Sequence, residues 1–394
     1  METKPKRILY LTFYFEPDLC AGSFRNSPLA KTLASKFGED NQIDIISTQP
    51  NRYSTFQSEA PELERRGNMT IHRIAIPTHQ SGFMDQIKSF YNYYSQAQKI
   101  ARQQKYDLVF ASSSRLFTAY LGYKIARKKK APLYLDIRDI FVDTMKDVLQ
   151  NKLIKSMVLP ILKYVEKKTF SDAKHINLIS GGFKPYFAKY TRPKYSEFPN
   201  GIDDAFLEME MSSTRNPKPP YKIVYAGNMG EGQGLHKIIP QAAKALEGQY
   251  EFLVIGDGGA KAKLEEALAE FKPKNVELHP PVKRSELFEI YKNTDFFFLH
   301  LNDYDAFKKV LPSKIFEMGA YNIPIIAGVG GFANEFIRKN VPNSILFDPG
   351  DVQSMVEQLK NYTYHEEERI QFKQDFTRAA INDKLAASIL GYLS

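Results

Sequence analysis

A cation and a carboxylate stand one helical turn apart near residue 314. The segment reads Val310-Leu-Pro-Ser-Lys-Ile-Phe-Glu317, and it is expected to open a helix with Pro312, Ser313 and Lys314 in its first turn. The free N–H groups and the dipole at a helix start favour an anion, and Lys314 adds a formal positive charge. Because Glu317 follows one turn later, the segment combines an anion site with a carboxylate.

A second candidate for phosphate binding is the glycine-rich stretch Ala226-Gly-Asn-Met-Gly-Glu-Gly-Gln-Gly-Leu235, which lies between an expected strand and an expected helix. Such a loop exposes several backbone N–H groups to a phosphate. The spacing is not Gly-x-Gly-x-x-Gly, and the lysine of a P-loop is missing, so dinucleotide binding and NTP hydrolysis are disfavoured. The residues expected to contact the ligand are Gly227, Asn228, Gly230 and Gln233.

Two further turns are expected at the same edge, because ligands of parallel α/β sheets bind at the carboxyl ends of the strands. One turn follows Val254 and presents Gly256 and Asp257. The other ends the segment from Val276 to Val282, where Val282 is the candidate contact. His279 in that segment is either a ligand contact or a structural histidine.

The first expected strand is followed by Ala21-Gly-Ser-Phe-Arg25, where Gly22 permits close approach of the backbone to a ligand. Arg25 lies near an expected helix start. This motif is weak, and a plain turn explains the same residues equally well.

The strand at Leu133 is followed by the polar cluster Asp136-Ile-Arg-Asp-Ile-Phe-Val-Asp143, placed where the first domain is expected to face the second. Arg138 is expected to orient a substrate phosphate or a leaving group. Asp139 is expected to orient Arg138 or an acceptor hydroxyl. A simple ion pair that caps the strand is the alternative.

These candidates need two α/β domains to position them. Short apolar runs alternate with longer helical patterns, which indicates βαβ units and parallel sheets. The pattern occurs twice, and a hinge rich in turn formers and prolines separates the two halves at residues 198–203 and 212–220. The first half comprises expected strands at 8–13, 43–46, 107–110 and 133–137 with helices at 27–36 and 116–127; the second comprises strands at 221–227, 251–256, 276–282, 295–299 and 323–327 with helices at 235–246 and 261–271.

Composition limits the class of protein. A chain of 394 residues with 43% hydrophobic and 25% charged residues fits two globular cores. The lone Cys20 has no partner for a disulfide, the N-terminus does not resemble a secretory signal, and no apolar run is long enough for a membrane span, so we expect a cytoplasmic protein. A net charge of +9 suits nucleic acid, anionic lipid or phosphorylated substrates, but nucleic-acid motifs are missing.

One segment has the pattern of a basic amphipathic helix. Residues 83–102 place Phe83, Met84, Ile87 and several aromatic residues on a helical period with Lys99 and Arg102. Such a helix can lie on a membrane or line an acceptor groove, and the alternative is a helix packed on its own sheet. Residues 127–130, Arg-Lys-Lys-Lys, are either a solvated helix end or a lipid contact.

Taken together, the motifs resemble those of the retaining glycosyltransferases of family 4, particularly the bacterial O-antigen and capsule members. The resemblance rests on the glycine near position 22, Asn200-Gly-Ile-Asp, Gly227 to Leu235, Gly256-Asp-Gly and Pro312 to Glu317. It implies an α/β fold of the GT-B type, in which two Rossmann-like domains with parallel sheets face each other across a cleft. It also implies an N-terminal acceptor-binding domain at residues 1–199, joined by a returning C-terminal helix at 373–394, and a donor-binding domain at 200–372.

The chain departs from the family pattern at two places. The family usually has two glutamates separated by seven residues, and the second holds the donor ribose; Glu317 matches the second, but Lys309 stands where the first belongs. The family also places Arg and Lys in the glycine loop, where this chain has Asn228 and Gln233. We therefore expect Lys314 to stabilise the departing diphosphate.

The resemblance implies transfer of a sugar, with retention, from a nucleotide-sugar, expected to be UDP-linked, to a hydroxyl of a lipid-linked glycan in surface polysaccharide synthesis. Arg138, Asp139, Lys314 and Glu317 are the expected catalytic residues, and no metal or other cofactor is expected. Asp303-Tyr-Asp305 looks like the metal-binding motif of a different transferase architecture, and we interpret it as a loop. Peripheral contact with the inner face of an anionic plasma membrane is expected, and binding to nucleic acid is not.

Two alternatives stay open. The first is a UDP-sugar epimerase of the same architecture, which isomerises the sugar without transferring it. The second is a non-catalytic or nucleic-acid-binding protein that uses the fold as a scaffold.

Overall fold

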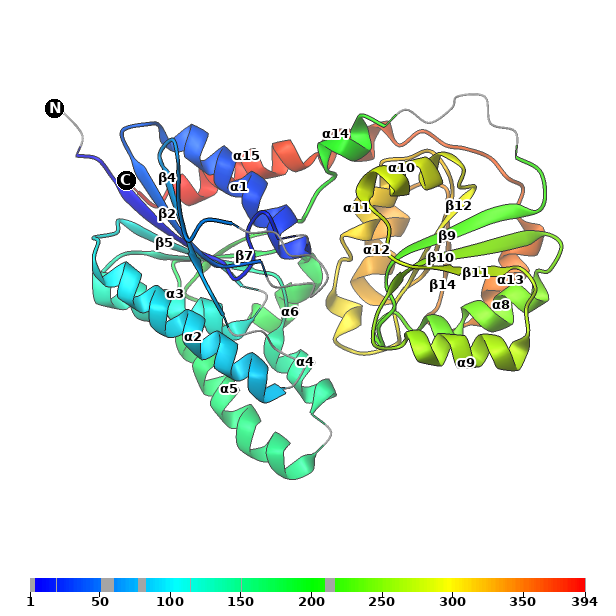
Figure 1. Cartoon of the computed structure of the whole chain (residues 1–394), viewed down its shortest axis with the longest axis horizontal. Helices are drawn as coiled ribbons and strands as arrows, with labels where there is room; N and C mark the ends of the chain where they lie inside the picture. The colour runs from blue at the N-terminus through cyan, green and yellow to red at the C-terminus, as the bar shows by residue number, and fades with distance from the viewer. Residues whose placement is uncertain are drawn as a thin grey trace. The chain divides into compact units, whose positions relative to one another are not determined.

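The computed structural model describes residues 4–18, 20–50, 60–76, 83–113, 115–149, 151–209 and 217–393, with only the backbone given for 83–88 and 147–148. The chain divides into two compact units (Figure 1). Unit 1 comprises residues 1–200 and 380–394, and unit 2 comprises residues 201–379. The chain rejoins unit 1 at residue 380, seven positions later than the expected residue 373.

Unit 1 is built on a sheet whose described strands run in the order β3-β4-β2-β1-β5-β6-β7-β8. All neighbours pair in parallel except β3 and β4, an antiparallel pair at the edge that the sequence pattern did not predict. The strands are β1 (Arg7–Leu11), β2 (Gln42–Thr48), β3 (Leu63–Arg66), β4 (Met69–Ile74), β5 (Leu108–Ser113), β6 (Leu133–Ile137), β7 (His175–Leu178) and β8 (Lys194–Ser196).

Helices cover this sheet, and the chain's last helix is one of them. In Figure 1 the C-terminal helix α15 lies beside α1, and its Leu385 and Ile389 join the same buried cluster as Ile8 and Leu29. The helices are α1 (Ala21–Phe37), α2 (Phe83–Arg102), α3 (Leu116–Lys129), α4 (Phe141–Val148), α5 (Lys152–Asp172), α6 (Lys184–Phe187) and α15 (Arg378–Leu390), with a 3₁₀ turn η1 (Gly181–Phe183).

Unit 2 is a wholly parallel sheet in the order β11-β10-β9-β12-β13-β14, with one apolar cluster on each face. Its strands are β9 (Tyr221–Asn228), β10 (Tyr250–Asp257), β11 (Val276–His279), β12 (Phe296–His300), β13 (Ile325–Gly328) and β14 (Ser344–Phe347). Its helices are α7 (Asp204–Leu207), α8 (Ile239–Ala245), α9 (Lys261–Phe271), α10 (Arg284–Lys292), α11 (Lys314–Gly319), α12 (Gly331–Asn340), α13 (Val352–Asn361) and α14 (Ile370–Asp375), with 3₁₀ turns η2 (Leu235–Lys237) and η3 (Phe307–Lys309).

Several expected boundaries are wrong for identifiable reasons. Helix α1 begins at Ala21, so Gly22 lies inside a helix and not in a loop, while Arg25 lies near the helix start as expected. The helix expected at 235–246 is split into η2 and α8, because Pro240 is tolerated only in the first turn of a helix. A bridge between Ile202 and Thr377 separates α14 from α15. Residues 212–216 of the expected hinge lie outside the described residues. Within the described ranges, we find no helix with the length and apolar character needed to span a bilayer.

Candidate functional site

The carboxyl ends of β9 and β10 are held together by two glycines. Gly227 and Gly256 are partners in the parallel register. Gly256 has a φ of 142°, and a Cβ there would lie 1.9 Å from the carbonyl oxygen of Gly227. No other residue fits this position without moving the strands apart. The glycines expected from the sequence therefore lie side by side at the sheet edge where ligands of parallel α/β sheets bind.

The loop after β9 is closed by two of the candidate side chains. Asn228 Nδ2 donates to Gln233 Oε1 at 2.9 Å, and the Gly230 N–H donates to the same oxygen at 3.2 Å. The Asn228 amide and the Gln233 carbonyl thus satisfy each other within the loop. The main effect of the two side chains here is to fix the loop's shape, and the loop itself contains no Lys or Arg between Gly227 and Leu235.

A buried histidine supports this loop from behind. His300, at the end of β12, is completely buried; its Nδ1 lies 2.6 Å from the Gln233 carbonyl oxygen, and its Nε2 accepts from the Gly350 N–H at 2.9 Å. These partners require the neutral ring with its proton on Nδ1. Burial lowers the pKa of His300 to about 4. The sequence analysis missed this residue, and the only available signal was its position at a strand end.

Asn302 supports the same loop from the other side, and the sequence analysis missed it too. Its backbone N–H donates to the Gly232 carbonyl at 2.8 Å, and its Oδ1 accepts from Lys237 Nζ at 3.0 Å. Gly234 has a φ of 57°, and a Cβ there would lie 2.6 Å from Asn302 Oδ1. The loop is therefore packed on the end of β12, with its conformation set by contacts on both sides.

Lys314 and Glu317 form one compact group beside this glycine edge. Lys314 Nζ donates to both carboxylate oxygens of Glu317, at 2.8 and 3.0 Å. Tyr291 Oη donates to Glu317 Oε1 at 2.5 Å, and burial together with the carboxylate raises the pKa of Tyr291 well above its usual value. A Cβ on Gly227 would lie 3.7 Å from Lys314 Cε, so the lysine side chain passes directly over the end of β9.

Helix α11 begins later than expected, at Lys314. It spans Lys314–Gly319, six residues, with Pro312 and Ser313 before it and no side-chain capping bond from Ser313. So short a helix has a weak dipole, so the expected anion site at its start is corrected: the positive charge here belongs to the Lys314 side chain.

The other candidates in unit 2 lie nearby without a comparable network. The Asp257 side chain is exposed and accepts from the Gly258 N–H at 2.8 Å. Val282 is partly buried against the apolar cluster, and Ser313 is exposed. His279 Nδ1 lies 2.9 Å from the carbonyl of its neighbour Pro280.

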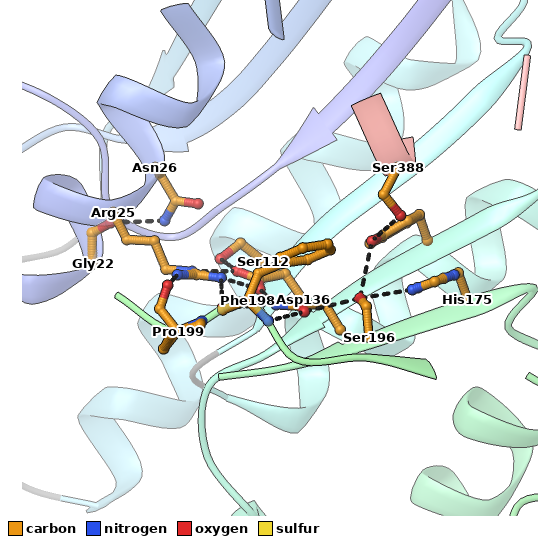
Figure 2. Close-up of polar contacts among 12 residues, drawn as sticks. Gly22, Arg25, Asn26, Ser112, Asp136, His175, Ser196, Phe198, Pro199 and Ser388 are labelled. Carbon is orange, nitrogen blue, oxygen red and sulfur yellow. Dashed lines mark hydrogen bonds and ion pairs between the residues drawn. The ribbon is translucent and has the colours of Figure 1, made fainter. Parts of the chain in front are cut away.

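In unit 1 a buried ion pair dominates the carboxyl edge of the sheet (Figure 2). Arg25 Nε and Nη2 donate to the two Asp136 oxygens at 2.8 and 2.7 Å, and both side chains are almost completely buried. Burial alone would raise the pKa of Asp136, but Arg25 and Asn177 hold it below its usual value.

The same arginine also fixes the end of unit 1. Arg25 Nη1 donates to the Pro199 carbonyl at 2.8 Å, and Nη2 donates to the Phe198 carbonyl at 2.9 Å. Asn177 binds Asp136 at 2.8 Å and accepts from the Phe198 N–H at 2.8 Å. Arg25 is therefore occupied in tying the segment at 198–199 to α1 and β6.

The alternative to a functional role, an ion pair at the end of the strand, is present for Asp136, which pairs with Arg25. Arg138 and Asp139 both belong to the described part of the chain, and they do not pair with each other. Arg138 Nε is buried without a hydrogen-bond partner, and burial together with Arg25 lowers the pKa of its guanidinium. Its Nη1 would lie 3.2 Å from a Cβ on Gly22. Asp139 accepts from Thr144 Oγ1 at 3.3 Å, and burial raises its pKa.

Two other expectations concern surfaces and metals. For the described side chains of α2, Tyr93 is buried and donates to backbone carbonyls of Thr12 and Ile46, so this part of the helix packs on its own sheet; the side chains of Phe83, Met84 and Ile87 lie outside the description. Asp303 and Asp305 both pair with Lys308, and no cluster of three or more potential His, Cys, Asp or Glu ligands occurs among the residues described.

Comparison with known proteins finds similar sequences and similar folds. Residues 208–378 match the family model of glycosyl transferases group 1. The WcaI protein of Escherichia coli (strain K12), named as a candidate colanic acid biosynthesis glycosyl transferase, is 26% identical over 225 residues, which are 54% of this chain and 55% of WcaI. The match thus spans about half the length of this curated relative.

Superposition on solved structures shows which fold the chain has. The lipopolysaccharide outer core galactosyltransferase WaaB in its apo form superposes with a TM-score of 0.65 at 13% identity, over 98% of this chain and 99% of WaaB. HepE of Anabaena in complex with UDP-glucose superposes with a TM-score of 0.60 at 14% identity, over 98% of this chain and 97% of HepE. Residues 208–378 are thus similar to the group 1 glycosyltransferases, and the two Rossmann-like units have the GT-B fold.

Proposed function

We propose that the protein is a retaining glycosyltransferase that moves a sugar from a nucleotide-sugar to a hydroxyl of a glycan acceptor. The group 1 match of unit 2 supports this activity, as does the glycosyl transferase description of WcaI. The HepE complexes with UDP and UDP-glucose support a UDP-linked donor.

The observation that carries the proposal is the position of Lys314 over Gly227. The glycine edge lets a diphosphate approach the backbone, and Lys314 supplies the charge that the Asn228–Gln233 loop lacks. Glu317 supplies acceptors for the ribose hydroxyls. A charge-assisted contact of this kind in a water-poor site contributes about 1.5–3 kcal/mol.

Transfer with retention breaks the bond between the anomeric carbon and the diphosphate oxygen. The acceptor hydroxyl attacks from the same face, forms the new bond to the anomeric carbon and gives its proton to the departing diphosphate. Lys314 stabilises the negative charge that develops on the leaving diphosphate. In unit 1, Arg138 has a guanidinium group whose Nε has no hydrogen-bond partner. We propose that this group orients a phosphate or the leaving group. Asp139 is proposed to orient the acceptor hydroxyl. We propose that the reaction needs no metal or other cofactor.

The acceptor is proposed to be a lipid-linked glycan of bacterial surface polysaccharide synthesis, such as O-antigen or capsule, used at the cytoplasmic face of the membrane. The descriptions of WcaI and WaaB, which concern colanic acid and the lipopolysaccharide core, support this class. Unit 1 is proposed to bind the acceptor and unit 2 the donor.

A direct test incubates the purified protein with a panel of UDP- and GDP-sugars, with and without lipid-linked glycans, and follows products by mass spectrometry and NMR. Transfer predicts that release of free nucleoside diphosphate depends on the acceptor and that the new linkage keeps the donor's anomeric configuration. An isomeric UDP-sugar without free UDP would favour the epimerase, and an inverted linkage would contradict retention.

A further inference from the structure

Helix α5 exposes a row of large apolar side chains to solvent. Leu153 and Met157 are 76% and 73% exposed, and Ile161 and Tyr164 are 61% and 62% exposed. Ile154 is 46% exposed. At about 100° per residue, these five positions fall within an arc of roughly 100° on one side of the helix. They therefore form one continuous stripe, which we call the α5 stripe.

The stripe is not the face by which α5 packs on its unit. The buried residues of α5 all lie in its second half: Leu162, Val165, Glu166, Thr169 and Phe170. From Lys152 to Ile161 the helix has no buried side chain, and Figure 1 shows this half reaching beyond the sheet of unit 1. A surface helix normally turns polar residues outward, so an apolar outward stripe marks an interaction surface.

The charges around the stripe have one sign. Lysines stand at positions 152, 155, 163, 167 and 168, and Glu166 is the single acidic residue between 151 and 168. Glu166 is buried, where Tyr186 and Tyr190 donate to its carboxylate at 2.7 Å. Lys168 Nζ lies 5.6 Å from the centroid of the Tyr164 ring, within the stripe. Lys155 Nζ donates to the Lys146 carbonyl oxygen at 2.5 Å. The exposed surface of this helix segment thus combines long apolar side chains with the ammonium groups of the other four lysines.

We propose that the α5 stripe docks on an anionic lipid bilayer, with Leu153, Met157 and Ile161 inserted below the headgroups and the lysines on lipid phosphates. Long aliphatic chains, a tyrosine and flanking lysines suit the boundary between headgroups and acyl chains. A second copy of the chain fits poorly, because pairing two stripes brings together two sets of four lysines, at positions 152, 163, 167 and 168.

This docking site rests on the proposed function, because it would bring the enzyme to an acceptor that is held in the membrane. The test uses lipid alone, without donor or acceptor, so that a failure of docking and a failure of transfer are seen separately.

The experiment measures sedimentation of the full chain with vesicles of phosphatidylcholine, with and without phosphatidylglycerol. The docking variant is Leu153→Gln/Met157→Gln/Ile161→Gln, and the charge variant is Lys152→Gln/Lys163→Gln/Lys167→Gln. Matched controls replace exposed apolar residues elsewhere: Leu63→Gln on β3, Tyr91→Gln on α2 and Ile370→Gln on α14. Circular dichroism melts check that every variant keeps the wild-type fold, which is expected because all the replaced side chains are exposed.

The wild type is expected to bind the anionic vesicles and to be released by salt. The docking variant is expected to lose more than about a hundredfold in partition, and the charge variant about fivefold per lysine, while the controls bind like the wild type. Three results would overturn the proposal: no preference for anionic vesicles, an equal loss in Tyr91→Gln, or a wild-type dimer in analytical ultracentrifugation that the docking variant dissociates.

Discussion

Lys314 and Glu317 neutralise each other across one helical turn, at 2.8 and 3.0 Å, directly beside Gly227. The lysine proposed for the diphosphate and the glutamate proposed for the ribose are therefore partners before any donor binds. Donor binding must exchange or share this ion pair, which couples the two ends of the nucleotide through one pair of side chains.

Replacing the cation tests that coupling. Lys314→Ala is expected to lower kcat/KM by about 10- to 100-fold, because about 1.5–3 kcal/mol of charge stabilisation is lost from the leaving diphosphate. Steady-state assays compare it with Lys244→Ala, which breaks exposed contacts with Glu247 and the Lys272 carbonyl and is expected to keep full activity. Equal activity of both variants would remove Lys314 from the mechanism.

The glycine edge gives a matched pair of variants three residues apart. Gly256→Ala is expected to lower the free energy of unfolding of unit 2 by about 2–5 kcal/mol, because the new methyl group meets the Gly227 carbonyl and the positive φ is strained. Gly259→Ala has no atom within 4 Å of its new Cβ and is expected to change stability by less than about 0.5 kcal/mol. Urea unfolding measures both, and similar values would contradict the close approach of β9 and β10.

His300 makes stability depend on pH. Its pKa is lowered by burial to about 4 from an ordinary value of 6.5, so between these values the unfolded chain binds a proton that the folded chain does not. Stability is therefore expected to fall as pH drops from 6.5 toward 4, by about 2 kcal/mol at about pH 5.

The non-titrating variant His300→Asn is expected to lose that part of the dependence. His175 in unit 1 has the same shift and keeps its contribution in both proteins, so the difference between wild type and variant isolates His300. An unchanged slope in urea unfolding across this pH range would show that His300 is protonated in the folded protein.

Replacing Arg138 distinguishes a functional role of this residue from a structural one. Its Nε is buried without a partner, so Arg138→Met is expected to leave the free energy of unfolding unchanged or raise it by about 1 kcal/mol. The same variant is expected to lose about a hundredfold in kcat/KM. The control Lys36→Met removes an exposed pair with Asp383 and is expected to change neither quantity. A less stable but fully active Arg138→Met would make Arg138 a structural residue.

The architecture could be predicted because short apolar runs alternate with longer helical patterns along the sequence. The parallel strands β9, β10 and β12 and the helix α9 follow that pattern closely. The antiparallel β3 could not be predicted, since Leu63–Arg66 is short, half charged and at a sheet edge. The start of α1 was misplaced because Gly22 and Pro28 look like loop residues, although both lie inside the helix.

Several residues of the site could be predicted from the sequence, but the hydrogen bonds and ion pairs between them could not. Spacing alone places Lys314 and Glu317 on one side of a helix. It cannot show that Asn228 bonds Gln233, or that Arg25 is taken up by Asp136, which lies 111 positions away in the sequence. His300 and Asn302 were missed for the same reason, because their partners lie in a loop about 70 residues earlier, and long-range partners leave no local signal.

The central claim is that Lys314 and Glu317 form the donor site, and a thermal-shift series tests it most directly. The wild type, Lys314→Ala and Glu317→Ala are melted with UDP, GDP, ADP and dTDP, and Lys244→Ala serves as the control. A ligand at about a hundred times its Kd stabilises the fold by about 2.7 kcal/mol. The account predicts that one nucleotide, UDP, raises the Tm of the wild type and of Lys244→Ala, and that both site variants lose the shift. An unchanged shift in the two site variants, or no shift of the wild type with any nucleotide, would contradict it.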